Sequence, residues 1–262
     1  MLESIKAIAK EAGQLILSAE NREKGVEEKS FAFDLVTQYD KAVQQLVEQR
    51  LHQLAPEAGF LAEEDVPAPE TADQNLLFII DPIDGTTNFI KNLHMSCVSI
   101  GVMRDGQMEY GVVYNPYADE LFSAQRGRGA WLNDQLLKPG PAQTARPVTI
   151  MGMSPYHRQQ FEEPTFSLMR KLFDASVDVR VTGSAALDFC FVAAGRAEMF
   201  CEFCMSPWDC AAASLIAQEA GCKVTDMRGA PLQFQEKTSV LAAHPACYKS
   251  LYTAAAPYTR YL

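Results

Sequence analysis

The sequence predicts a mixed α/β protein with an N-terminal half over 1–143 and a C-terminal half over 144–262. Two segments with apolar residues at helical spacing open the chain. From 95 to 123 the pattern changes to extended segments, and Asp105-Gly106 is a strong hairpin signal between two of them. Beyond Gly140-Pro141, strand and helix patterns alternate, which is typical of a layered α/β arrangement.

The first half begins with two predicted helices. Residues 2 to 19 place apolar side chains on one face. The second helix runs to about residue 54, and Asp40 is positioned as its N-cap. A short apolar segment at 59–62 follows and stops at Glu63. An antiparallel sheet is expected to complete this half.

An apolar run over 76–80 predicts a buried strand that ends at Asp81. Pro82 and Gly85 then favour a tight turn, after which Thr86 or Thr87 caps a helix. Two acids three residues apart on such a turn, facing the free NH groups of a helix start, suit a cation beside an anion. The same residue types also occur in ordinary turns, so this stretch alone leaves both interpretations open.

The second half alternates strands with helices. A helix is expected to begin at Trp208-Asp209 and to be closed by Gly221. Strands are predicted over 148–151, 177–181, 197–201, 222–225 and 240–243, and helices over 187–194, 208–220 and 247–255.

Composition narrows the function. The chain has 262 residues, 48% hydrophobic and 21% charged, with a formal charge of −10 and no block of Lys or Arg, which argues against a nucleic-acid surface. An acidic protein that binds an anionic substrate needs metal ions to reverse the local field. The N-terminus lacks the apolar core of a signal peptide, no stretch reaches the ~20 residues of a membrane span, and the seven cysteines do not suggest a disulfide framework. We therefore expect a cytoplasmic protein with no membrane partner.

Four acids fall at the ends of apolar segments or at a helix start: Glu63, Asp81, Asp84 and Asp209. Carboxylates from three separate segments suit a site for two or more Mg²⁺ ions. The four histidines cluster with none of them, which argues against zinc. Taken singly, Asp209 is also explained as a helix cap and Glu63 as a loop residue.

With these residues in view, the sequence resembles the inositol monophosphatase family. The stretch Asp81-Pro82-Ile83-Asp84-Gly85-Thr86-Thr87-Asn88-Phe89 is similar to the family signature. A second signature is matched by Trp208-Asp209-Cys210-Ala211-Ala212 and, further on, by Glu219-Ala220-Gly221. The upstream pair Glu63-Glu64 and the early Asp34-Leu35-Val36-Thr37-Gln38-Tyr39-Asp40 complete four matches in the family's order.

The resemblance implies a layered α-β-α-β-α sandwich of the sugar phosphatase type, usually a homodimer, with a Mg²⁺-dependent and Li⁺-sensitive phosphomonoesterase activity. Glu63, Asp81 and the carbonyl of Ile83 would hold one Mg²⁺. Asp81, Asp84 and Asp209 would hold a second, and Glu63 with waters a third, weaker ion.

The resemblance also implies catalytic and substrate-binding roles. Thr86, with Glu63 and a hydrogen bond involving Asp40, would position the attacking water, and the NH groups of Gly85 and Thr86 would bind phosphate. Lys29 and Asp34 match further family positions. The substrate side would comprise Asp84, Gly85, Thr86, Ser184, Ala185, Glu202 and Asp209.

Several interpretations stay open. Glu202 suits contact with sugar hydroxyls but would also be explained as the end of a strand. Inositol monophosphate or a related sugar phosphate leads the substrate choices, ahead of fructose 1,6-bisphosphate (alone or with dual specificity) and then 3′-phosphoadenosine phosphate. A regulatory binding protein on the same fold is the non-enzymatic alternative. Cys201-x-x-Cys204 suggests zinc or redox chemistry, although buried thiols are common.

Overall fold

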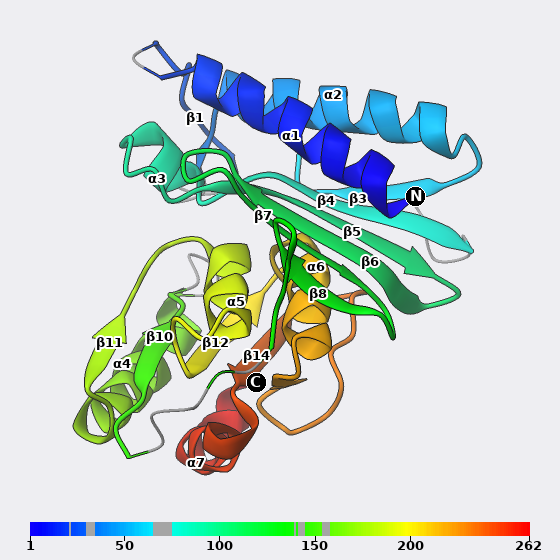
Figure 1. Cartoon of the computed structure of the whole chain (residues 1–262). Helices are drawn as coiled ribbons and strands as arrows, with labels where there is room; N and C mark the ends of the chain where they lie inside the picture. The colour runs from blue at the N-terminus through cyan, green and yellow to red at the C-terminus, as the bar shows by residue number, and fades with distance from the viewer. Residues whose placement is uncertain (21, 30–34, 65–74, 139, 141–144, 154–157) are drawn as a thin grey trace.

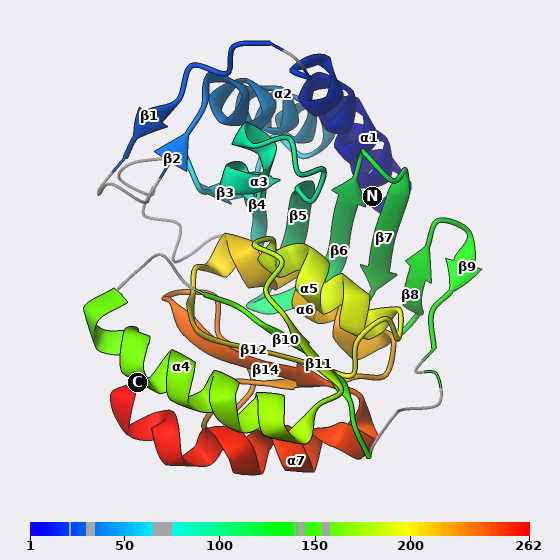
Figure 2. The same cartoon turned by 90° about the vertical axis from the view of Figure 1, so that its left-hand side faces the viewer.

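Five alternating layers of helix and sheet build the protein (Figures 1 and 2). The computed structural model describes residues 1–20, 22–29, 35–64, 75–138, 140, 145–153 and 158–262. Two helices cover a seven-stranded sheet, two more helices lie in the middle, and a five-stranded sheet with its outer helices closes the stack (Figure 2). The predicted mixed α/β sandwich is confirmed.

The outer layer packs one face of the first sheet. Helices α1 (Leu2–Ser18) and α2 (Gln38–Leu54) bury Ile5, Ile16 and Val47 in one core with the first sheet, where α2 packs against strand β4 (Leu76–Asp84). Each large apolar side chain removed from water contributes about 1.5–3 kcal/mol. The hydrophobic stripes of the two predicted helices are therefore what fixes them to the sheet.

The first sheet has the order β3-β4-β5-β6-β7-β8-β9 and is antiparallel except for the β3–β4 pair. A two-stranded ribbon, β1 with β2, lies beside it. The remaining strands of these two sheets are β1 (Glu27–Glu28), β2 (Leu35–Val36), β3 (Gly59–Ala62), β5 (Cys97–Arg104), β6 (Gln107–Asn115), β7 (Glu120–Gln125), β8 (Gly129–Leu132) and β9 (Gln135–Leu136).

Strand β4 is longer than predicted. It continues through Asp81 to Asp84, is buried along its whole length, and shows a register irregularity against β5 between these two acids. Its side chains alternate between two cores: Ile80 packs toward α1 and α2, and Ile79 packs toward the middle helices. Because both faces are covered, the run carries no polar alternation, and its end could not be read from the sequence.

Two predicted helix caps are wrong. Thr37 is the N-cap of α2, and Asp40 occupies the third helical position, where its side chain accepts the Thr37 NH in a capping box. The short helix α3 (Thr86–Ile90) has Gly85 as its N-cap, with φ of 87°, in place of a threonine. Thr86 and Thr87 lie inside the first turn because the left-handed turn before them requires glycine.

The second sheet has the order β11-β10-β12-β14-β13 and mixes parallel with antiparallel pairs. Its strands are β10 (Val148–Met151), β11 (Asp178–Arg180), β12 (Met199–Met205), β13 (Lys223–Thr225) and β14 (Thr238–Ala243). The helices of this half are α4 (Arg158–Ala175), α5 (Ala185–Ala193), α6 (Pro207–Glu219), α7 (Pro245–Ala255) and the 3₁₀ helix η1 (Ala256–Tyr261).

Most predicted elements of the second half are confirmed, with ends displaced by a few residues. Helix α4 was not predicted, because Pro164 indicates a helix break and the segment is largely polar. The structure buries the Pro164 ring and packs Leu168 and Leu172 of α4 into the core shared with α7. In the described part of the chain, no helix is long and apolar enough to cross a membrane. All seven cysteines are buried, and none of them forms a disulfide within the described part of the chain.

Helix α6 lies unusually close to the first sheet. A Cβ atom on Gly111 of β6 would overlap the carbonyl oxygen of Ala212, and one on Gly101 of β5 would lie 3.3 Å from the Ala212 nitrogen. The two glycines therefore let the helix backbone approach the strands directly. This contact sets the position of Asp209, which lies in the first turn of α6.

We predict that Gly111→Ala lowers the free energy of unfolding by about 1–3 kcal/mol, because the methyl group meets backbone that cannot turn aside. Denaturant unfolding measures the change. Gly140→Ala is the matched control, since its Cβ would have no neighbour within 4 Å, and it should change stability by less than about 0.5 kcal/mol. Equal effects of the two substitutions would contradict the close-approach argument.

Candidate active site

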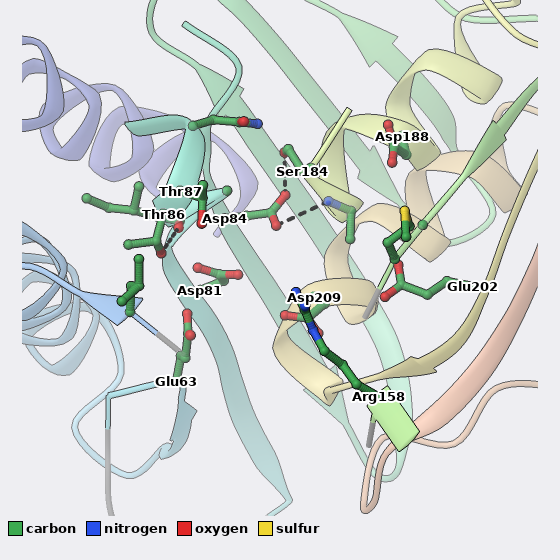
Figure 3. A pocket seen from close by; sticks show the side chains of 18 residues that line it. Glu63, Asp81, Asp84, Thr86, Thr87, Arg158, Ser184, Asp188, Glu202 and Asp209 are labelled. Carbon is green, nitrogen blue, oxygen red and sulfur yellow. Dashed lines mark hydrogen bonds between the residues drawn. The ribbon is translucent and has the colours of Figure 1, made fainter. Parts of the chain in front are cut away.

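Acidic side chains from both halves of the protein meet in one cavity of about 280 Å³ between the two sheets (Figure 3). They come from the end of β3, from β4, from α5 and β12, and from the first turn of α6. The acids that line the cavity are Glu63, Asp81, Asp84, Asp188, Glu202 and Asp209. The structure thus brings together the four acids that the sequence singled out.

Asp84 is held by the start of α5. Its carboxylate accepts hydrogen bonds from the Ser184 hydroxyl at 2.5 Å, the Ala186 NH at 2.8 Å and the Ala185 NH at 3.2 Å. The buried Cys97 thiol lies 3.6 Å from the same carboxylate. A helix N-terminus stabilises a negative charge. Ser184 and Ala185, predicted as substrate residues, therefore also support an acid of the site.

Asp81 lacks such support. It is 2% exposed, and its Oδ1 atom has no hydrogen-bond partner within the described structure. Buried carboxylate oxygens without a partner cost free energy. An oxygen of this kind, aimed into an acid-lined cavity, is chemically suited to a hard cation.

Asp209 and Glu63 approach Asp81 from separate elements. Asp209 accepts the Ser206 NH at 2.7 Å, which fixes its carboxylate at the start of α6. Glu63 follows β3, and its NH donates to the carbonyl of Ile80 at 3.2 Å, so the strand ladder places it beside β4. The ammonium of Lys29 bridges Glu63 at 2.9 Å and Glu64 at 2.7 Å.

Burial and mutual repulsion disfavour the ionised acids. Burial first, and then the charges of Glu63, Asp84 and Asp209, raise the pKa of Asp81 well above its ordinary value. Burial and the charges of Glu63 and Asp84 likewise raise the pKa of Asp209. Burial raises the pKa of Asp84 to about 6 although the bonds from α5 oppose it. The cavity therefore favours positive charge.

Thr86 connects the cavity to α2. Its hydroxyl oxygen lies 3.2 Å from Asp40 Oδ1 and 3.1 Å from the carbonyl of Ile83. Asp40 is fully buried, and burial raises its pKa to about 6 against the bonds from Thr37. When the Thr86 hydroxyl donates its hydrogen bond to Asp40, its oxygen can accept a hydrogen bond from a water.

Gly85 provides the turn between Asp84 and α3. A Cβ atom there would lie 2.9 Å from the Met95 carbonyl and 3.0 Å from that of Gly183. The left-handed turn leaves the first NH groups of α3 beside the cavity, next to the acids. Such NH groups favour an anion.

The far side of the cavity contains residues that sequence reasoning partly missed. Glu202 of β12, for which the sequence predicts a substrate contact, is buried there, and Gly152 is required beside it, because a Cβ atom on Gly152 would overlap the Glu202 carboxylate. Asp188 of α5 and Arg158 of α4 also line the cavity but were not predicted. An acid inside an otherwise apolar helix was the available signal for Asp188, whose carboxylate accepts the Thr182 hydroxyl.

The cysteine pair occupies a different environment. Cys201 and Cys204 lie in the core between β12 and the outer helices, whereas Glu202 turns the opposite way into the cavity. Burial raises the pKa of the Cys201 thiol to about 12. Asp34 and the start of its motif lie outside the described residues.

The donor set fits divalent cations. It consists of carboxylates and the Ile83 carbonyl, which are oxygen ligands that Mg²⁺ prefers. Among described residues, no three acid, histidine or cysteine side chains are already arranged to hold a metal ion. The fit therefore rests on ligand chemistry, on the Asp81 oxygen without a partner, and on the mutual repulsion that a cation would relieve.

Comparison with known proteins shows which family the chain resembles in sequence and in structure. The family model described as the inositol monophosphatase family matches residues 1–260. The protein named Nus factor SuhB from Vibrio cholerae is 36% identical over 248 residues, which cover 95% of this chain and 92% of that protein. The crystal structure of extragenic suppressor protein suhB from Bartonella henselae superposes with a TM-score of 0.88 at 32% identity, covering 97% of each chain.

Two further solved structures contain ligands. An IMPase/NADP phosphatase complexed with Mg²⁺ and phosphate has a TM-score of 0.83 at 28% identity and covers 94% of this chain and 90% of its own. SaIMPase-II bound to inositol monophosphate has a TM-score of 0.83 at 25% identity, with 99% and 96% covered.

The raised carboxyl pKa values predict a pH-dependent stabilisation by Mg²⁺. The folded chain keeps a proton on Asp84 that the unfolded chain releases between about pH 4 and about pH 6, so this contribution to stability is lost as the pH rises through that range. Bound Mg²⁺ replaces the proton, so its increase in Tm should be larger near pH 7.5 than near pH 5. Each kcal/mol corresponds to about 2–4 °C in a chain of this size.

Differential scanning fluorimetry with Mg²⁺ or EDTA at the two pH values measures this difference. Asp81→Asn should reduce the Mg²⁺-dependent increase, and Asp134→Asn, an exposed change in the β8–β9 turn, should not. An increase in Tm that is the same at both pH values would contradict the prediction.

Proposed function

Because the chain belongs to the inositol monophosphatase family, we propose that it is a Mg²⁺-dependent phosphomonoesterase that hydrolyses inositol monophosphate or a related sugar phosphate. The observation that carries the proposal is the meeting of Glu63, Asp81, Asp84 and Asp209 in one buried cavity beside the start of α3. Solved relatives with Mg²⁺ and phosphate, and with inositol monophosphate, support this choice of cofactor and substrate.

The acids hold the cofactor in this proposal. Glu63, Asp81 and the Ile83 carbonyl form one ligand set, Asp81, Asp84 and Asp209 a second, and Glu63 part of a weaker third. Mg²⁺ bound there would supply Lewis acidity toward water and phosphoryl oxygens. The ammonium of Lys29 forms an ion pair with Glu63 at 2.9 Å and thereby restrains its carboxylate.

The polar groups at the start of α3 position the reactants. The Thr86 hydroxyl, oriented by Asp40, and the Glu63 carboxylate hold the attacking water. The NH groups of Gly85 and Thr86 bind the phosphate from the helix start. These contacts place reactants in advance, which lowers the entropic part of the barrier.

The leaving group lies on the other side, near Glu202, Ser184 and Ala185. Buried carboxylates accept two hydroxyl hydrogen bonds from a polyol, and Gly152 leaves the space that the Glu202 carboxylate occupies. Fructose 1,6-bisphosphate and 3′-phosphoadenosine phosphate remain the alternative substrates. Inhibition by Li⁺ is part of the proposal.

A homodimer is also proposed. Apolar side chains remain exposed along α4 and the edge strand β11 and its flanks, including Phe173 at 65%, Val177 at 63% and Val181 at 50%. Exposed apolar groups that gather on one side favour association. Light scattering after size exclusion tests this part of the proposal.

A second function is favoured by the relative named Nus factor SuhB, since that name describes no enzyme. We propose, as the alternative, that the chain acts as a regulatory binding protein on the same fold. Complementation with Asp84→Asn in cells that lack the chain separates the two. Growth restored by a variant without hydrolytic activity would favour binding, and failure to restore it would favour catalysis.

We predict that the protein releases phosphate from inositol monophosphate only when Mg²⁺ is present. Asp84→Asn and Asp209→Asn should each lower turnover by at least about 10²-fold, comparable to the loss of one strong transition-state stabiliser. Phosphate release from a panel of phosphomonoesters measures this, with Asp134→Asn as the control. A folded protein that hydrolyses no member of the panel would refute the enzymatic proposal.

A further inference from the structure

The catalytic cavity contains one feature that metal binding does not explain, the side chain of Arg158. Among the described residues that line the cavity it is the sole cation, beside six acids. Arg158 is the first residue of α4, and Figure 3 shows its side chain extending from that helix toward Asp209. Helix geometry does not account for it, because a cation in the first turn opposes the helix macrodipole.

The position of Arg158 relative to the reacting groups indicates its role. Glu63 and Thr86, which hold the attacking water in the proposed function, lie on one side of the acids, whereas Glu202 and Arg158 lie on the other (Figure 3). In an in-line displacement the leaving oxygen departs opposite the attacking one. Arg158 therefore faces the leaving group rather than the phosphate under attack.

The space around Arg158 extends beyond the catalytic cavity. Arg158 and Met153 also line an adjoining cavity of about 250 Å³. Its other walls are Phe161, Glu162, Thr165, Phe166 and Phe203, so among the described residues Arg158 is the cation of this cavity as well, beside a single acid. A leaving group that passes Glu202 thus meets a guanidinium at the junction of two cavities. A monophosphorylated polyol has hydroxyl groups for Glu202 but no charge for Arg158.

We propose that Arg158 binds a second anionic group, a phosphate or a carboxylate, on the leaving group of the substrate. The guanidinium presents several NH donors in a plane that matches these two anions. Arg158 is then the specificity-determining residue that makes phosphomonoesters with a second anionic group better substrates than their neutral counterparts. This inference rests on the proposed phosphatase function and specifies its substrate class.

The test compares paired substrates that differ only in the second group. Fructose 1,6-bisphosphate is paired with fructose 1-phosphate, and 2-phosphoglycerate with glycerol 2-phosphate, so the two pairs distinguish phosphate from carboxylate. The measured quantity is the ratio of kcat/KM within each pair, with Mg²⁺ present. The wild-type protein should favour the charged member of at least one pair.

Arg158→Gln should lower that ratio by about 10- to 100-fold, as expected for a lost hydrogen-bonded ion pair, while kcat/KM for the neutral member stays nearly constant. Arg158→Lys should recover part of the ratio, because it keeps the charge but loses the planar pair of donors. Arg170→Gln, an exposed arginine on the same helix, is the matched control and should leave the ratio unchanged.

The inference is overturned if the wild-type protein shows no preference in either pair, or if Arg158→Gln and Arg170→Gln change the ratio equally. Hydrolysis of inositol monophosphate together with an unchanged ratio would refute the role of Arg158 alone. If no substrate is hydrolysed, the proposed function fails, and titration calorimetry of fructose 1,6-bisphosphate against fructose 1-phosphate then decides whether Arg158 binds the second phosphate.

Discussion

Repulsion among buried carboxylates is the constraint on which the rest of this structure depends. Asp81, Asp84 and Asp209 share one cavity with Glu63, and burial together with their neighbours' charges raises the pKa of Asp81 and Asp209. The fold offsets part of this cost with local dipoles. The start of α5 donates to Asp84, and the Ser206 NH donates to Asp209. Asp81 Oδ1, in contrast, is buried in this group with no hydrogen-bond partner in the described part of the chain.

The middle layer of helices is what keeps these groups together. Helix α6 approaches β5 and β6 through Gly101 and Gly111, at a distance that larger side chains would prevent. Helix α5 packs beside it with Leu187 and Phe189 in the same core. Both helices begin at the cavity, so their packing and the geometry of the acids are determined by the same contacts. Apolar burial in this layer thereby supports a site that electrostatics alone would open.

The two sides of the cavity differ in what they offer a ligand. The side formed by β4 and α3 presents acids and helix NH groups, which suit metal ions and phosphate. These groups belong to the stretch 81–89, which resembles the family signature. The side formed by β12, α5 and α4 presents Glu202, Asp188 and Arg158, and this side faces the leaving group in the proposed function. We expect substitutions that change the substrate preference of this fold to lie on this second side, because they leave the proposed metal ligands in place.

The sequence by itself determined the fold class and the acids of the site. Three local patterns predicted the fold class: the helical spacing in the first segments, the apolar run before Asp81 and the alternation after Gly140. Such patterns can be recognised in a sequence because the geometry of a helix or strand sets the spacing of its buried residues. The acids at the ends of those patterns were visible for the same reason.

Only the tertiary structure decided which distant groups complete the cavity. The Ser184 hydroxyl donates to Asp84, which lies 100 residues away in the chain. Gly152 leaves space for the Glu202 carboxylate. Arg158 begins helix α4, which the sequence did not predict because Pro164 lies inside it. Thr37, rather than Asp40, is the N-cap of α2, because the Thr37 side chain accepts the NH of Asp40. Asp40 in turn accepts the Thr37 NH and the Thr86 hydroxyl, and the second of these contacts crosses the core. Contacts between residues far apart in the chain leave no periodic trace, so packing alone fixes them.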